Sequence, residues 1–211
     1  MWVLLFRNGE RGSLISSLLV ATHNPGKLKE LRYLFSDLSV KILSLSEVGI
    51  NSDVEETGAT LEENAELKAR TYGDLSGLCT VADDSGLEVA ALNGAPGVFS
   101  ARYAGEHATD MQRIAKLHQN LRKEGKPWRA RFRCVMAVNL PGTELSSFEG
   151  ICDGEIIDEL RGGGGFGYDP IFVPKCMDRT MSEITEIEKN EISHRAKAAR
   201  KVVEHLRNYY K

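Results

Sequence analysis

The chain has 211 residues, 42% of them hydrophobic, and a formal net charge of −3 at pH 7. This length predicts one domain, or one domain with two lobes, and the apolar content suffices for a core. The slight acidity gives no overall attraction to nucleic acid, and the basic run of Arg129, Arg131 and Arg133 is too small to change that expectation. No stretch reaches the ~18 apolar residues that a membrane-spanning helix needs.

Residues 1–17 precede the first strand-like run and are expected to be an extension of unknown role. They imitate a secretory signal only weakly, because Glu10 intervenes and the apolar stretch holds two serines. Residues 18–211 are then expected to form a single two-lobed domain. The four widely spaced cysteines form no C-x-x-C pair, which argues against a zinc site or a disulfide framework and favours a reducing cytoplasm.

The first turn of the chain is a possible anion site. Residues 18–22 read as a strand, residues 23–27 (His-Asn-Pro-Gly-Lys) as a polar turn, and Leu28, Leu31 and Leu34 as one face of a helix. Free N–H groups and the helix dipole favour phosphate at such a helix start. The spacing is not that of a Walker A loop, and an ordinary turn with a solvated lysine is the alternative.

A second helix is predicted after the strand-like run 40–45 and a polar, acidic stretch. Thr60 and Glu63 form a capping-box pattern at its start. Its apolar face comprises Leu61, Ala65, Ala69 and Tyr72. By default, the polar residues are expected to be solvated, namely Glu62, Glu63, Asn64 and Lys68.

Two adjacent aspartates, Asp83 and Asp84, follow the apolar run 78–82 and precede Ser85 and Gly86. Unpaired buried charge is costly, and a divalent cation such as Mg²⁺ is the usual reason for paired carboxylates. Because strand residues alternate between faces, either the strand ends at Asp83 or the two aspartates have different partners. A surface turn between two strands is the alternative. Residues 87–92 read as the returning strand.

The middle of the chain predicts antiparallel strands. A capping box at Thr109 and Gln112 opens a helix, and residues 129–140 alternate as a long strand with one buried face. Residues 145–152 and 154–160 predict two more strands. Three adjacent antiparallel strands beside the earlier ones suggest a mixed sheet.

Two further stretches point to a ligand. Residues 161–170 contain five glycines in six positions, which allow close approach, followed by an aromatic and acidic run. A flexible linker is the alternative. The last helix begins near Ser193, and His194 and Arg195 in its first turn, after Lys189, suggest an anionic or carbonyl-bearing ligand. A capped, solvated helix start is the alternative there.

Seven segments between about residues 18 and 207 together resemble the inosine/xanthosine triphosphate pyrophosphatases, in that family's order and spacing. They are Thr22–Lys27, Glu55–Gly58, Glu63–Ala65 with Lys68, Ala82–Gly86, Gly94–Gly97 with Ser100–Arg102, Gly164–Pro170 and Ile192–Arg195. The chain departs from the family at His23, where many members have glycine, and at Gly163, where threonine is common.

The resemblance implies an α/β fold with a long, twisted mixed β-sheet flanked by helices, two lobes and a central active-site cleft. It also implies a homodimer and the cofactor Mg²⁺. The implied catalytic base is Asp84, and the implied metal ligands are Glu55 and Asp84, with Asp83 close by. The implied substrate-binding residues are Thr22, His23, Asn24, Pro25, Gly26, Lys27, Lys68, Ser85, Phe166, Gly167, Tyr168, Asp169, Lys189, His194 and Arg195.

The implied reaction converts a non-standard purine nucleoside triphosphate, dITP, ITP or XTP, into the monophosphate and pyrophosphate. Donors near His194 and Arg195 would suit a 6-oxo group and disfavour the 6-amino group of ATP. A general metal-dependent nucleotide phosphohydrolase that releases phosphate is an alternative. A nucleotide-binding regulatory module without turnover is another.

Overall fold

The computed structural model describes residues 16–209, and the predicted extension of residues 1–17 lies almost wholly outside them. One six-stranded sheet, in the order β2-β1-β3-β4-β5-β6, organises the molecule. β1 is parallel to β2 and β3, whereas the pairs from β3 to β6 are antiparallel. The strands are β1 (Ser17–Val20), β2 (Lys41–Ser44), β3 (Cys79–Val89), β4 (Trp128–Asn139), β5 (Ser146–Ile156) and β6 (Phe172–Pro174).

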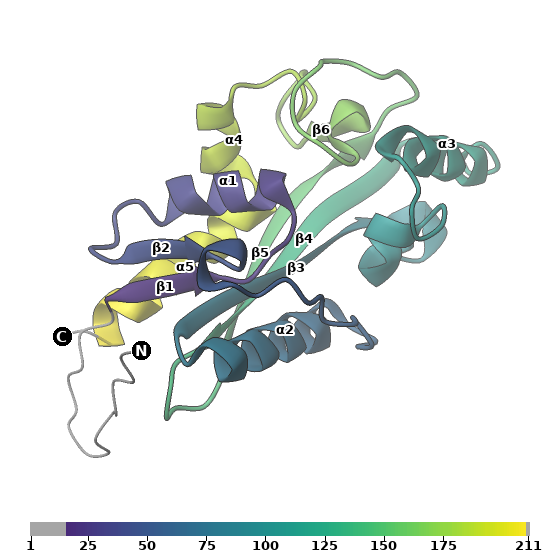
Figure 1. Ribbon diagram of the computed structural model, residues 1–211. Coiled ribbons are helices and arrows are strands. Elements are labelled where there is room, and N and C mark those ends of the chain that lie inside the picture. The colour runs from purple at the N-terminus through teal and green to yellow at the C-terminus, as the bar shows by residue number, and fades with distance from the viewer. Residues whose placement is uncertain (1–15, 210–211) are drawn as a thin grey trace.

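Helices cover both faces of this sheet and one of its ends (Figure 1). They are α1 (Pro25–Leu34), α2 (Leu61–Ser76), α3 (Asp110–Leu121), α4 (Glu186–Ile192) and α5 (His194–Tyr209). The predicted mixed sheet flanked by helices is confirmed. Within residues 16–209, every helix is too short or too polar to cross a bilayer.

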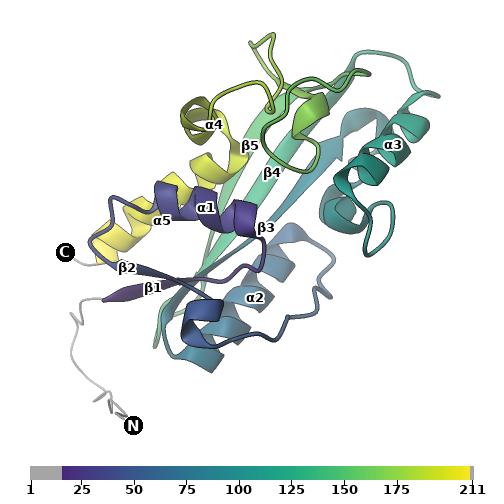
Figure 2. The ribbon, with the colours of Figure 1, turned by 45° about the horizontal axis from the view of Figure 1, so that its top comes forward.

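Three apolar clusters hold the helices to the sheet, and strand alternation assigns each cluster its face. Leu18 and Val81 face α1 and α5 in one cluster, whereas Leu19 and Ala82 face α2 in another. The third cluster joins α3 to the far ends of β3, β4 and β5. Figures 1 and 2 show α3 at the opposite end of the molecule from β1 and β2. The long strands therefore connect two clusters, on opposite faces of the sheet beside β1, to the third cluster at the α3 end.

β3 runs without interruption through Asp83 and Asp84, so the predicted break between two strands is wrong. All residues from Thr80 to Val89 pair with β4, which keeps the backbone extended. Gly86 is needed for close approach rather than for a turn. A Cβ on Gly86 would lie 2.3 Å from the carbonyl oxygen of Gly97, at the start of the 3₁₀ helix η3 (Gly97–Arg102).

β5 is likewise one strand where two were predicted. It pairs with β4 from Ser146 to Ile156, and Gly154 lies in that ladder opposite Ala130. β6 pairs with only the last three residues of β5. Along the rest of its outer edge, Lys197 and Lys201 of α5 donate to carbonyl oxygens of β5 at 2.7 and 2.8 Å.

Most predicted helix starts are confirmed. Thr109 and Gln112 form a complete capping box, and Ser193 accepts the Ala196 amide at the start of α5. At α2, Thr60 caps the amide of Glu63, but the Glu63 side chain accepts from Ala59 instead of closing the box. α4, with its own capping box, was not predicted.

Candidate active site

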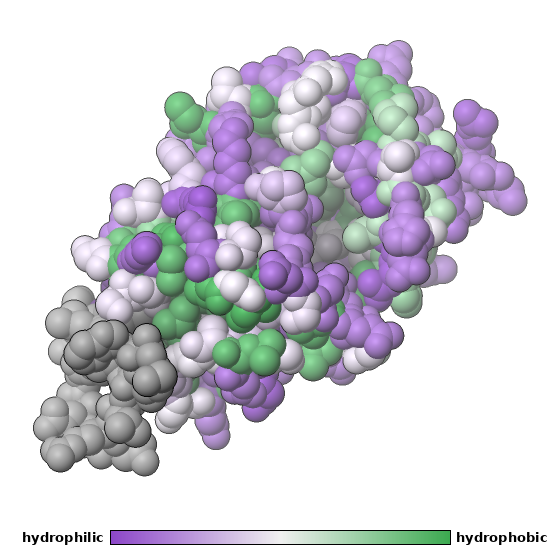
Figure 3. All heavy atoms as spheres, in the orientation of Figure 1, coloured by the Kyte–Doolittle hydropathy of each residue, from purple (hydrophilic) through white to green (hydrophobic). Residues whose placement is uncertain are grey.

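A cavity of about 380 Å³ lies between the N-terminus of α1, β3, η3 and the glycine-rich loop 161–168. Figure 3 shows a hollow in the middle of the molecule, bordered largely by hydrophilic residues. Most of the predicted site residues line the cavity: Thr22, His23, Asn24, Lys27, Lys68, Asp84, Ser85, Phe166, Gly167, Tyr168, Asp169, Lys189, His194 and Arg195. Pro25, Gly26, Asp83 and Glu55 do not line it.

The turn before α1 has the geometry of an anion site. Asn24 is the N-cap, and its side chain accepts the Lys27 amide at 3.1 Å, while Pro25 occupies the first helical position. Thr22 Oγ1 accepts the Asn24 amide at 3.2 Å, which fixes the turn. A helix start with lysine in its first turn favours phosphate.

Asp83 and Asp84 point to opposite faces of β3 and have different partners. Asp83 lies 2.9 Å from Lys27 Nζ and 3.5 Å from Arg195 Nε. Burial alone raises the pKa of Asp83, but Lys27 and then Arg195 outweigh it and hold the pKa well below the ordinary range. Asp83 is therefore an ionised carboxylate at neutral pH and pairs with two cations.

Asp84 faces the cavity together with Lys68 of α2, and the buried Asn64 of the same helix also contacts it. Asn64 Nδ2 donates to Asp84 at 3.2 Å, and Lys68 Nζ lies 3.5 Å from it. Burial raises the pKa of Asp84; Lys68 opposes this and Glu56 adds to it. Asn64 and Lys68 are buried, so the default expectation of a solvated face is wrong for both. Asp84 is placed to accept a proton inside the cavity.

The acidic stretch before α2 brings Glu56 to the cavity and leaves Glu55 exposed at its outside. Glu56 lies 2.5 Å from Lys68 Nζ and 3.4 Å from Arg102. The Thr57 amide donates to Glu55 O at 3.1 Å, which turns the chain at Glu56 and gives the two glutamates different directions. The position predicted for Glu55 is therefore taken by Glu56.

Two carboxylates beside the cavity are the residues available to a divalent cation. No three His, Cys, Asp or Glu side chains within residues 16–209 gather into a set able to hold a metal ion. Glu56 and Asp84, however, converge on the same ammonium group. Mg²⁺ is commonly held by one or two carboxylates and substrate phosphates rather than by an all-protein cage, so this pair fits.

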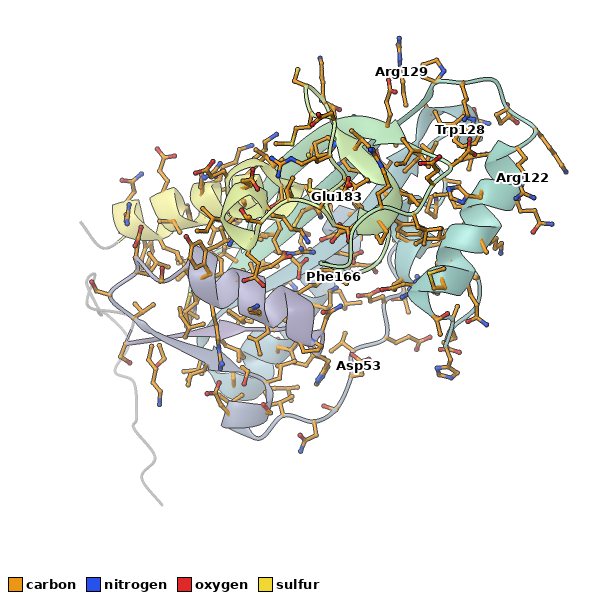
Figure 4. All side chains as sticks on the ribbon, turned by 90° about the horizontal axis from the view of Figure 1, so that it is seen from above. Asp53, Arg122, Trp128, Arg129, Phe166 and Glu183 are labelled. Atoms are coloured by element: carbon orange, nitrogen blue, oxygen red, sulfur yellow. The ribbon has the colours of Figure 1, made fainter. Side chains whose placement is uncertain are left out.

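Phe166 lies beside α1 near the middle of the molecule, far from Trp128 at the α3 end (Figure 4). A Cβ on Gly26 would lie 3.0 Å from its ring. Lys189 Nζ and the Arg195 guanidinium lie 4.8 and 5.7 Å from the ring centroid. The aromatic face, flanked by two cations, is suited to stacking with a planar ligand.

Asp169 holds the glycine-rich loop in place through a backbone hydrogen bond and an ion pair. Its carboxylate accepts the Phe166 amide at 3.0 Å and lies 2.7 Å from Lys189 Nζ. Tyr168, also predicted, donates its hydroxyl to Ser100 O at 3.0 Å. These contacts fix the backbone that carries Phe166.

His194 and Arg195 are both buried, and they differ in charge. Burial, then the charges of Arg195 and Lys189, hold the pKa of His194 well below its ordinary value, so its imidazole is neutral. The ring stacks on Phe132 with centroids 4.8 Å apart. Arg195 donates to Glu30 at 2.5 Å and to Ser85 Oγ at 3.3 Å, which fixes its guanidinium beside the cavity.

Sequence analysis did not single out several residues in or behind the cavity. Glu30 of α1 does not line the cavity, but it accepts from two residues that do, Lys189 and Arg195, at 2.9 and 2.5 Å. Its position one turn after Lys27, on the first helix, was the available signal. Asp53, Tyr72, Asp110 and Arg113 line the cavity, and no local motif marks them as ligand-binding.

The whole chain is similar to known proteins and to solved structures. A dITP/XTP pyrophosphatase of Bacillus subtilis is 47% identical over 190 residues, which cover 90% of this chain and 96% of that protein. A second, from Christiangramia forsetii, is 47% identical over 189 residues, covering 90% and 98%. The structure of a HAM1 protein from Coxiella burnetii gives a TM-score of 0.83 at 43% identity, covering 91% of this chain and 98% of that one.

The model of the Ham1 family matches residues 18–205, almost the whole of the described chain. This range coincides with the seven segments from which the family resemblance was inferred, and the resemblance is confirmed. The chain belongs to the Ham1 family.

Proposed function

We propose that this chain hydrolyses non-standard purine nucleoside triphosphates, dITP or ITP and XTP, to the monophosphate and pyrophosphate. The observation that supports this most is a single cavity with a phosphate-type helix start at Lys27, a raised-pKa carboxylate at Asp84 and an aromatic platform at Phe166. The related proteins described above carry the name dITP/XTP pyrophosphatase.

Asp84 would act as the base that accepts a proton from the attacking water or positions that water. Lys27 and Lys68 would balance the negative charge of the triphosphate. Glu56 and Asp84 would hold Mg²⁺, which supplies charge neutralisation on the phosphates and orientation of the leaving pyrophosphate. Lys68 lies beside both carboxylates and favours their ionised forms; the pKa of Glu56 is lowered, whereas burial still leaves the pKa of Asp84 raised.

The base would stack on Phe166, with its 6-oxo edge toward the Arg195 end of the cavity. An acceptor at position 6 suits the positive charge there, whereas the 6-amino group of adenine places a donor against donors. A site built on such pairing can discriminate by roughly 10⁴-fold. The ion pairs of Arg195 with Glu30 and Asp83 would hold its guanidinium in place before the substrate binds.

Product analysis with Mg²⁺ tests the proposal. Purified protein is given dITP, XTP, GTP or ATP separately, and monophosphate, pyrophosphate and orthophosphate are quantified by ion-exchange chromatography. Pyrophosphate from dITP and XTP, with little from GTP or ATP, is expected. Orthophosphate would indicate a general phosphohydrolase, and tight binding without turnover would indicate a regulatory module.

The two neighbouring glutamates give a matched test of the metal site. Glu56→Gln should raise the Mg²⁺ concentration needed for half-maximal activity by at least about tenfold, a loss that even outer contacts of a metal site can cause. Glu55→Gln, one residue away and exposed, should leave it within about twofold. Equal responses of the two variants in a Mg²⁺ titration would remove Glu56 from the metal site.

Assembly as a homodimer and residence in the cytoplasm are further parts of the proposal. Family resemblance supports the dimer. The four free cysteines support a reducing compartment: three are buried, and burial raises the pKa of Cys79 to about 12, so its thiol stays protonated. Light scattering at micromolar protein concentration measures the assembly state directly.

A further inference from the structure

Asp110, the first residue of α3, contacts the loop that carries Phe166. Its Oδ2 accepts the backbone amide of Gly167 at 2.7 Å. Gly167 has φ +66°, a conformation that favours glycine, so the loop backbone is tightly bent at this bond. The contact joins residues 57 positions apart, so the local capping-box pattern around Asp110 gives no sign of it.

Arg113, one turn along α3, fixes the orientation of the Asp110 carboxylate. Its guanidinium bonds Asp110 Oδ1 and also donates to Ala101 O of η3 at 2.6 Å. Both side chains line the cavity. The pair therefore connects three elements: α3, η3 and the glycine-rich loop.

The loop around Phe166 is held from two sides. On the α4 side, Asp169 accepts the Phe166 amide at 3.0 Å and pairs with Lys189. On the α3 side, Asp110 accepts the next amide along the chain, that of Gly167. Two consecutive amides that bond carboxylates from different sides define the plane of the backbone, and hence the direction in which the Phe166 ring leaves it.

We propose that Asp110 is a positioning residue for the purine base, acting through Gly167 to fix the Phe166 ring at the angle the base needs. The inference rests on the proposed function, which supplies the base. Asp110 does not touch the phosphate end of the cavity, where Lys27, Lys68 and Asp84 lie. Its loss therefore weakens binding of base-bearing ligands and spares ligands that consist of phosphate alone.

Because the Asp110 side chain is partly exposed, its substitution is expected to affect the loop without destabilising the whole fold. About 40% of the Asp110 side chain is exposed, so its removal leaves no deeply buried charge without a partner. Asp110→Ala should raise the KM for dITP and the dissociation constant of IMP on the order of tenfold, since a hydrogen bond to a charged group contributes about that factor. The kcat and the inhibition constant of pyrophosphate should stay within about twofold.

Two matched variants complete the experiment. Asp110→Asn keeps an oxygen for the Gly167 amide and should restore IMP affinity to within about threefold of the unmodified protein. Thr109→Ala removes the N-cap of the same helix without touching the loop, so it should lower the melting temperature but leave IMP affinity unchanged. IMP binding is measured by calorimetry, which needs no turnover.

The outcomes are distinct. Unchanged IMP affinity in Asp110→Ala, an equal loss of pyrophosphate affinity, or the same loss in Thr109→Ala would each overturn the positioning role. Failure of the unmodified protein to release pyrophosphate from dITP would overturn the proposed function instead. If the unmodified protein released pyrophosphate from dITP but did not bind IMP, the positioning role alone would be overturned.

Discussion

Asp84→Asn should abolish nearly all turnover while leaving the protein folded. The amide cannot accept the proton of the attacking water, and general-base groups contribute 10²–10⁴-fold, so kcat should fall by about 10³-fold or more. The fold should tolerate the change because burial raises the pKa of Asp84, which means that the folded state disfavours the ionised carboxylate. A neutral amide removes that cost.

The measurement pairs kcat at saturating Mg²⁺ and dITP with the melting temperature. The control is the neighbouring position, where Asp83→Asn removes a carboxylate whose pKa is lowered by Lys27 and Arg195. That variant should lose stability, unlike Asp84→Asn. If the Asp84→Asn protein is well folded and keeps a large fraction of the wild-type kcat, Asp84 is not the base.

Arg195→Ala should destabilise the protein by about 3–5 kcal/mol, because it breaks a buried ionic network. The guanidinium is 2% exposed and pairs with Glu30 and Asp83. Its removal leaves two carboxylates, one of them completely buried, with fewer cations than they need. Urea denaturation at pH 7 measures the change in free energy of unfolding.

Arg200→Ala is the matched control on the same helix. Arg200 is exposed and donates to the carbonyl oxygens of Asn190 and Glu191, so its loss should cost less than about 1 kcal/mol. A similar cost at both positions would contradict the network's importance.

Acidification gives an independent check on the same network. The folded-state pKa of Asp83 lies below its unfolded value of about 3.9, so its stabilising pairing is complete above that pH and is lost as the pH falls further. The difference in stability between wild type and Arg195→Ala should therefore shrink at acid pH. A difference that grew on acidification would contradict this assignment.

The sequence predicted the parts of the site that depend on local pattern. Thr22 to Lys27 reads as a strand, a turn and a helix start, and the structure has that order because Asn24 can cap and Pro25 fits the first helical position. The Asp83–Asp84 pair was expected to end a strand or to have two sets of partners. The second description is the observed one, because pairing with β4 holds the strand straight.

Other parts depend on contacts between distant residues, which local pattern does not contain. Asn64 and Lys68 look like a solvated helix face, yet both are buried and both contact Asp84 of β3. Glu30 and Arg195 are 165 residues apart in the chain. Glu55 and Glu56 are adjacent and chemically alike, and only the path of an irregular segment decides which one faces inward.

The straight course of β3 also limits how the chain can change in length. A strand alternates its side chains with a period of two, so one inserted or deleted residue before Asp83 would exchange the directions of the two aspartates relative to the preceding core residues. Either Val81 and Ala82 would exchange the helices that they pack against, or Asp83 and Asp84 would exchange the cations that they pair with. We therefore expect no tolerated insertion within Cys79–Val89, whereas the exposed turn at Pro141–Gly142 should accept one.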